Sequence, residues 1–299
     1  MLTRPQYLAL VGALLAVTAV WGLTFVTVQE AVRSFPVMSF LGWRFAAAAL
    51  LLVPFTWRDL GKLGWSGVLT GAWIGVFLAA GYVLQTDGLT LIPVPTVGFI
   101  TGLVVVFTPI LALIVFRHRP HWVVWVGVAL STAGLWLLTG AGASWSGGDL
   151  LVVGSALAFA VQILGTEAAV RRLPVGGLVL VEVATTAAIS LVWAGAARQL
   201  VVPHLASTWV ALGITAIFAS VIGGLVQGWV QRSISASRAA IIMSAEPAFA
   251  ALFAYLLQGS VLNPIGWLGA VLIMVAVLGV QLWPRAQSAQ MDPQGAGDG

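Results

Sequence analysis

Ten long apolar segments, joined by short connections, account for most of this chain. A helix needs roughly 20 apolar residues to cross the hydrocarbon core of a bilayer, which is about 30 Å thick. The strands of a membrane β-barrel are instead about ten residues long and alternate in polarity. Since the segments are longer and apolar on every face, the sequence predicts an all-α membrane protein with ten transmembrane helices, near residues 7–28, 37–57, 68–84, 94–116, 123–138, 150–169, 177–196, 209–229, 239–257 and 264–283.

The charge content excludes most soluble functions. Only 7% of the 299 residues are charged and 60% are hydrophobic, whereas soluble domains carry roughly 25% charged residues. The absence of cysteine excludes disulfides, thiol chemistry and cysteine-ligated metals. The net charge is +4, but the basic residues are too few and too scattered to follow a nucleic-acid backbone. We therefore expect a bilayer protein with no nucleic-acid partner.

The residues that catalysis would need are not gathered in the apolar segments. The three histidines lie in connections, and the sequence contains neither His-Glu-x-x-His nor Gly-x-Ser-x-Gly. Intramembrane catalysis would need a nucleophile with a base, paired acids or a metal cluster. We therefore expect no enzyme activity, no metal and no cofactor.

The basic residues are distributed unevenly over the two sets of connections that ten spans would create. One set and the two tails hold ten of the 13 Lys and Arg, and the other set holds only Arg33 and Arg198. Because cytoplasmic connections are enriched in Lys and Arg, this ratio predicts that both termini are cytoplasmic. With a single Lys against twelve Arg, the composition hints at a bacterial source, so we expect a multi-pass protein of the bacterial inner membrane. The polar tail, residues 284–299, is predicted to be a disordered cytoplasmic segment.

The chain contains an internal repeat. Five of seven residues match between the segments 31–37 and 169–175, at an offset of 138 residues, and the same offset relates Pro109 to Pro247. Trp125 and Trp267 match at an offset of 142, a change that we attribute to an extra stretch at 258–263 between the last two helices. We therefore predict two five-helix repeats, residues 1–140 and 141–283.

Five helices per repeat is an odd number, so the second repeat enters the membrane from the opposite side. Inverted-topology repeats are typical of transporters, in which the two halves exchange conformations and open alternately to each side. The pattern therefore predicts alternating access at the interface between the repeats. Because both repeats lie in one chain, we expect the protein to function as a monomer.

The arrangement resembles the drug/metabolite transporter superfamily, in particular its EamA-type ten-helix permeases. The matching motifs are Trp21-Gly22-Leu23-Thr24-Phe25, Trp43-Arg44-Phe45, Phe99-Ile100-Thr101-Gly102, Thr108-Pro109, Gln227-Gly228-Trp229-Val230-Gln231 and Ser244-Ala245-Glu246-Pro247-Ala248-Phe249-Ala250. The resemblance implies a carrier of small metabolites, often an exporter of amino acids or related compounds. Small multidrug relatives couple to protons through a Glu in the first helix, but the first apolar segment here contains no acid.

Three charged residues lie deep in the predicted spans. Arg44 and Glu182 are each eight residues from a proline at a span edge, and they are 138 residues apart, so they occupy equivalent repeat positions. Glu246 lies eight residues after Arg238, near the midplane. Charges at this depth are functional candidates by default. One reading is that Arg44 and one of the carboxylates form an ion pair that binds a zwitterion; the other is a purely structural pair, or single charges that reach for an interface.

Aromatic and amide side chains within the spans are further candidates for lining a cavity. We single out Trp21, Trp43, Trp73, Tyr82, Gln85, Phe99, Phe159, Gln162 and Gln227, which together would favour apolar or aromatic metabolites. Pro109 and Pro247 each remove a backbone hydrogen bond inside a predicted helix and are candidate kinks or hinges. The resulting hypothesis is export of small metabolites such as amino acids. The alternative is a proton-coupled multidrug antiporter of the same architecture, with Glu182 or Glu246 as the titrating group.

Overall fold

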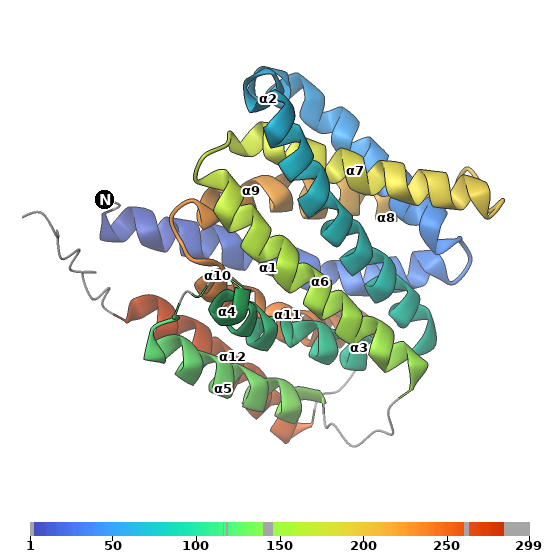
Figure 1. Cartoon of the computed structure of the whole chain (residues 1–299). Coiled ribbons are helices and arrows are strands. Elements are labelled where there is room, and N and C mark those ends of the chain that lie inside the picture. Colours follow the sequence, from blue (N-terminus) through green and yellow to red (C-terminus); the bar gives the residue numbers. More distant parts are fainter. Residues whose placement is uncertain (1–2, 116, 118, 140–145, 260–262, 284–299) are drawn as a thin grey trace, which may run out of the picture.

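The computed structural model describes residues 3–115, 117, 119–139, 146–259 and 263–283. Over these residues the protein contains helices and connections only (Figure 1). The predicted disordered tail at 284–299 lies outside the described residues. The elements are α1 (Arg4–Val32), α2 (Val37–Leu91), α3 (Val94–Gly102), α4 (Val104–Val115), α5 (Trp122–Thr139), α6 (Gly147–Val170), α7 (Val175–Ala196), α8 (Ala206–Ile214), the π-helix η1 (Thr215–Ile222), α9 (Gly223–Gln231), α10 (Ala236–Met243), α11 (Glu246–Gln258) and α12 (Pro264–Leu282).

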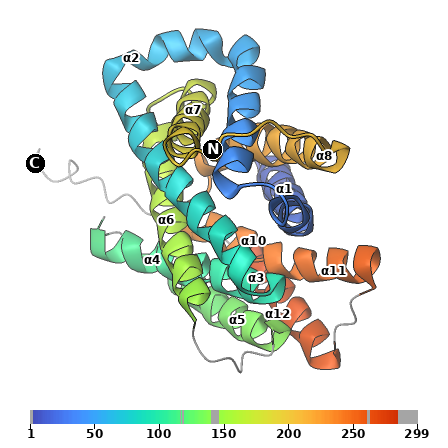
Figure 2. The same cartoon turned by 90° about the vertical axis from the view of Figure 1, so that its right-hand side faces the viewer.

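The helices have the length and composition of membrane spans. Within the described part of the chain, eight helical segments are long and apolar enough to cross a membrane, and Trp122–Leu138 forms a shorter apolar helix. One of the eight is the 55-residue α2, which contains a residue with non-helical backbone angles, Gly64, at φ 63°. Glycine adopts this left-handed conformation at no steric cost. Figure 2 shows α2 turning a corner, so its two limbs correspond to the second and third predicted segments.

Two further predicted segments are interrupted near, but not at, the proline that each contains. The break between α3 and α4 lies at Leu103, whose N–H bonds to the carbonyl of Ile100 in a tight turn. Pro109 lies six residues later, inside α4. The break between α10 and α11 precedes Pro247, the second residue of α11, by two to three residues. The two prolines therefore stand at different positions relative to the interruptions, because only the second follows its break immediately.

The helix boundaries recur along the chain at two offsets. The end of α1 and the start of α2 recur 138 residues later, at the end of α6 and the start of α7. The starts of α3, α4 and α5 recur 142 residues later, at the starts of α10, α11 and α12. The offset thus changes before α3, where the first half turns at Gly64 and the second runs through residues 197–205. This corrects our attribution of the change to residues 258–263 and our pairing of Pro109 with Pro247.

The tightest helix contacts join the first half of the chain to the second. The most extensive packing is between α2 and α7, followed by α5 with α12, α2 with α6 and α1 with α11. Small residues allow these approaches: a Cβ at Gly75 would lie 2.8 Å from the carbonyl oxygen of Glu182, and one at Gly134 would lie 2.7 Å from that of Gly269. In both views the α5–α12 pair lies at the opposite side of the molecule from α7, with α1 between them.

Candidate functional site

A cavity lies between the two halves, where α1, α2, the α3–α4 pair, α6, α9 and the α10–α11 pair converge. It leaves about 70 Å³ for the centres of water-sized molecules. We call it the central cavity; its lining residues are Trp21, Thr24, Phe25, Val28, Arg44, Leu78, Tyr82, Gln85, Thr86, Leu89, Thr101, Val104, Phe159, Gln227, Met243 and Glu246. Seven of the candidates from the sequence are among them: Trp21, Arg44, Tyr82, Gln85, Phe159, Gln227 and Glu246.

Arg44 is held in the wall of this cavity by an aromatic cluster and one hydroxyl. Its side chain is only 3% exposed, and its Nε donates to Ser220 Oγ at 3.0 Å. The guanidinium carbon lies 4.5 Å from the ring centre of Tyr82 and 4.8 Å from that of Phe45. Cation–π contacts of this kind stabilise a charge without neutralising it. Arg44 therefore offers an intact positive charge to the cavity that it lines.

Glu246 places a carboxyl group in the same cavity by a different route. It is the first residue of α11, directly after the break in the helix, so the partial positive charge of the helix N-terminus favours its ionised form. The position of its carboxyl is therefore fixed by the backbone.

The ion pair that we expected between Arg44 and a carboxylate is not formed. Among the described residues, ion pairs within 4.0 Å join Arg33 to Glu30, Lys62 to Asp59 and Arg171 to Glu167, and none of them includes Arg44, Glu182 or Glu246. The physical reason is that Ser220 and two aromatic rings already hold the guanidinium.

Glu182 and Gln162 lie beside the central cavity. Glu182 is 3% exposed and accepts hydrogen bonds from Gln162 Nε2 at 3.2 Å and Thr166 Oγ1 at 3.4 Å. Gln162 in turn accepts from Gln227 Nε2 at 3.2 Å. A smaller cavity of about 30 Å³ touches Glu182, Gln162 and Ser220 and shares Trp21, Leu78, Tyr82 and Gln227 with the central cavity. Gln227 thus connects the two compartments.

Three candidates lie outside both cavities. Trp43 donates its Nε1 hydrogen to the carbonyl of Val201 at 2.8 Å and so holds the connection between α7 and α8. Trp73 is 52% exposed, with its ring 4.7 Å from that of Phe77. Phe99 packs edge-on against Trp136.

Several lining residues were missed by the sequence reading. Thr24, Phe25 and Val28 follow Trp21 on one face of α1, and Thr101 accepts a hydrogen bond from Gln85 Nε2 at 3.2 Å. The spacing of three and four residues along α1 was the available signal, because residues at that spacing share a helix face. Met243 and Val104 carried no such signal, since they reach the cavity only through the breaks that follow α10 and α3.

Comparisons with known proteins agree with this architecture. The model of the EamA-like transporter family matches residues 8–140 and again residues 146–282. The chain is 32% identical over 271 residues to an "Uncharacterized transporter" of Archaeoglobus fulgidus, a match that covers 89% of this chain and 83% of that one. It is 29% identical over 287 residues to the "Uncharacterized inner membrane transporter YedA" of Escherichia coli K12, with 93% and 92% of the chains covered.

A solved structure described as "Crystal structure of protein" shares the fold, with a TM-score of 0.76 at 15% identity over 93% of this chain and 96% of that one. Together with the membrane-spanning helices, the matches identify a multi-pass membrane protein of the inner-membrane type. The family model covers almost the whole chain. The chain therefore belongs to the EamA-like transporter family.

Proposed function

We propose that this protein exports small zwitterionic metabolites, such as amino acids or related compounds, across the inner membrane of a bacterial cell. The observation that carries the proposal is the central cavity itself: Arg44 and Glu246 both line it, and neither enters an ion pair with another described residue. A charge buried at membrane depth is costly unless it is compensated. A zwitterion compensates both charges at once, with its carboxylate near Arg44 and its ammonium near Glu246.

The remaining lining residues select for the rest of such a substrate. Trp21, Phe25, Tyr82 and Phe159 give the cavity an aromatic wall, and the rings of Tyr82 and Phe159 meet edge-on with centres 5.2 Å apart. Ligand sites commonly combine an apolar lining with a few polar groups that fix orientation. The wall favours a zwitterion with an apolar or aromatic side chain over a strongly polar one.

We infer that the chain crosses the membrane ten times, as two inverted five-helix repeats with boundaries at 1–140 and 141–283. The two limbs of α2, the shorter α5 and the recurrence of the helix boundaries support this count. The excess of Lys and Arg on one set of connections supports cytoplasmic termini. Because both repeats contribute to one cavity, a single chain is a complete transporter that works by alternating access.

Uptake into proteoliposomes tests the substrate class. We expect saturable uptake of at least one apolar or aromatic amino acid, and much weaker uptake of its carboxamide, which lacks the carboxylate. Replacing Arg44 with Gln should lower the preference for the acid over the amide by about tenfold or more, since a charge-assisted hydrogen bond contributes roughly 1.5–3 kcal/mol. Arg58→Gln is the matched control, because Arg58 lies over Trp57 at the surface. Equal uptake of acid and amide by the unaltered protein contradicts the proposal.

A second candidate, the proton-coupled multidrug antiporter, is favoured by one observation. Glu182 is almost fully buried, and its hydrogen-bond partners Gln162 and Thr166 are neutral. A carboxyl in such a place is a candidate for carrying a proton. An imposed pH gradient should then drive transport in the unaltered protein and have no effect in Glu182→Gln. Transport that is indifferent to the gradient in both proteins removes this candidate.

A further inference from the structure

One end of the central cavity is closed by apolar packing. A cluster of buried side chains from α4, α6 and α10 fills the space beyond Val104, Phe159 and Met243: Val104, Ala112, Ala160, Ile163, Leu164, Ala236 and Ala240. We call this cluster the plug. It separates the central cavity from a surface depression at the far end of α6, which Glu167, Arg171 and Ser235 help to line.

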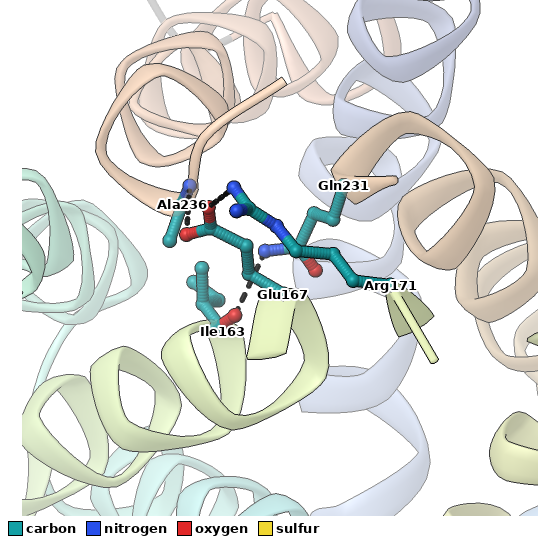
Figure 3. A network of polar contacts seen from close by, with 5 residues as sticks. All are labelled: Ile163, Glu167, Arg171, Gln231 and Ala236. Carbon is teal, nitrogen blue, oxygen red and sulfur yellow. Dashed lines mark hydrogen bonds and ion pairs between the residues drawn. The ribbon is translucent and has the colours of Figure 1, made fainter. Parts of the chain in front are cut away.

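Beyond the plug, polar contacts tie the end of α6 to the connection between α9 and α10 (Figure 3). Glu167 accepts a hydrogen bond from the backbone N–H of Ala236 at 2.8 Å and also pairs with Arg171. Gln231 Nε2 donates to the carbonyl of Ile163, and Arg232 Nε to that of Val170, both at 2.9 Å. We call this set the latch. Its central contact places a carboxylate at the N-terminus of α10, which favours negative charge.

The other end of the central cavity is open. A pocket of about 530 Å³ lies there, and it shares Leu89 with the central cavity. We call this pocket the vestibule; its lining residues are Gln29, Val32, Arg33, Leu89, Thr90, Leu91, Ile92 and Pro93. The vestibule is lined by the end of α1 and by the connection from α2 to α3.

The vestibule residues occupy the positions of the latch residues in the other half of the chain. The offset of 138 that relates the ends of α1 and α6, and the offset of 142 that relates the starts of α3 and α10, give the correspondence. Glu167, Val170 and Arg171 correspond to Gln29, Val32 and Arg33, whereas Gln231, Arg232 and Ala236 correspond to Leu89, Thr90 and Val94. Five of these six counterparts line the vestibule, and Val94 begins α3 immediately beyond it.

We propose that the vestibule is an open latch, and that in the alternate state of the transport cycle the side-chain oxygen of Gln29 accepts the backbone N–H of Val94 while the contacts of Glu167 with Ala236 are broken. The proposal rests on the alternating-access function argued above. It assigns a specific pair of residues to each closed end. The same backbone geometry, a helix N-terminus facing the last turn of a neighbouring helix, serves both ends.

The two latches differ in strength because their side chains differ. The vestibule positions hold the neutral Gln29 where the latch holds Glu167, and Leu89 and Thr90 where the latch holds Gln231 and Arg232. A hydrogen bond to an ionised acceptor is roughly twice as strong as a neutral one. The protein should therefore rest with the latch closed and the vestibule open, which is the state described here.

Paired cysteines test the proposal directly, because the chain contains no native cysteine. In the Gln29→Cys/Val94→Cys protein, a short bifunctional thiosulfonate should cross-link the pair during turnover of a transported amino acid and stop uptake. The matched control is Glu30→Cys/Val94→Cys, since Glu30 is adjacent but exposed in its pair with Arg33. Glu167→Cys/Ala236→Cys should cross-link without substrate and also stop uptake.

A second measurement reports the position of the equilibrium. Thr24→Cys places a thiol in the central cavity, where a membrane-impermeant maleimide can reach it from the open side. Glu167→Ala should lower the labelling rate from the vestibule side by about tenfold, given the strength of a charged hydrogen bond, and raise it from the latch side. Gln29→Glu should shift accessibility in the same direction. Glu30→Ala should leave both rates unchanged.

The outcomes separate the inference from the proposed function. If uptake proceeds but Gln29→Cys/Val94→Cys cross-links no better than its control, the residue assignment is wrong while transport stands. If Thr24→Cys is labelled from one side only under every condition and no amino acid is taken up, both the inference and the proposed function are overturned. The cross-linking arm retains Glu167, so it remains decisive even if Glu167→Ala fails to fold.

Discussion

The two halves of the chain contribute similar shapes but opposite charges to the central cavity. The half that spans residues 8–140 supplies Arg44, and the half that spans residues 146–282 supplies Glu246 and, beside the cavity, Glu182. Aromatic residues stand at equivalent positions, since Trp21 and Phe159 are 138 residues apart and both line the cavity. Arg44 and Glu182 are related by the same offset. Repetition has thus preserved the fold while the charges have diverged.

This difference suits a substrate with two charged ends. Two identical halves would place like charges at equivalent depths, where they would repel each other and bind only a symmetric ion. One cationic and one anionic half instead create a dipolar cavity. The predictions below test whether the division of charge between the halves matters as much as this comparison implies.

The largest effect should come from giving both halves the same charge. Arg44→Glu places an acid in the wall that faces Glu246, and unpaired charge inside a protein costs several kcal/mol. We expect loss of uptake together with reduced yield of folded protein. Arg44→Lys, which keeps the positive charge, should retain measurable uptake. Uptake at the unaltered rate by Arg44→Glu contradicts the dipolar cavity.

A slightly smaller effect should follow from separating the halves where α1 meets α11. A Cβ at Gly22 would lie 2.8 Å from both the N of Ala250 and the O of Glu246, and these backbone atoms cannot move without moving α11. Gly22→Ala should therefore lower stability by about 1–3 kcal/mol, the usual cost of overpacking, and displace Glu246. Thermal unfolding and the KM for uptake measure the two effects. Gly12→Ala is the control, because nothing lies within 4 Å of that position.

The two carboxylates of the second half should differ from each other. Glu246→Gln should raise the KM for a zwitterion by about tenfold through loss of a charge-assisted contact. Glu182→Gln keeps its hydrogen bonds to Gln162 and Thr166 and lies beside the cavity, so its KM should change far less. Concentration series at fixed pH measure both constants. Equal increases in KM would place Glu182 in the binding site and remove the distinction.

The smallest effect is expected at a tryptophan outside both cavities. Trp73 is half exposed and contacts Phe77, so Trp73→Leu should leave the KM unchanged. Trp21→Leu removes a cavity-lining indole whose Nε1 donates to the carbonyl of Ala219 at 3.0 Å, and it should raise the KM for aromatic substrates. Parallel uptake assays on the two variants show whether the cavity boundary has been drawn correctly.

The sequence predicted the membrane-spanning helices well because hydrophobic length is a direct physical requirement of a bilayer. It also placed Arg44 and Glu246 at cavity depth, since depth follows from counting residues along a helix. It did not predict that Ser220 and Tyr82 would hold Arg44, because depth says nothing about which neighbour a side chain faces. The alignment of Pro109 with Pro247 was wrong because apolar segments match at several offsets, and only the helix boundaries decide between them.

The close approach of Gly134 to Gly269 has a consequence for how the protein is made. The extensive contacts of α5 are with α12, those of α1 with α11 and those of α2 with α7 and α6. Each early helix therefore waits for a partner that the ribosome delivers much later. The two halves are units of ancestry but not units of folding, since neither can bury its contact surfaces alone. Two halves synthesised as separate chains should accordingly assemble only when they meet in the same membrane.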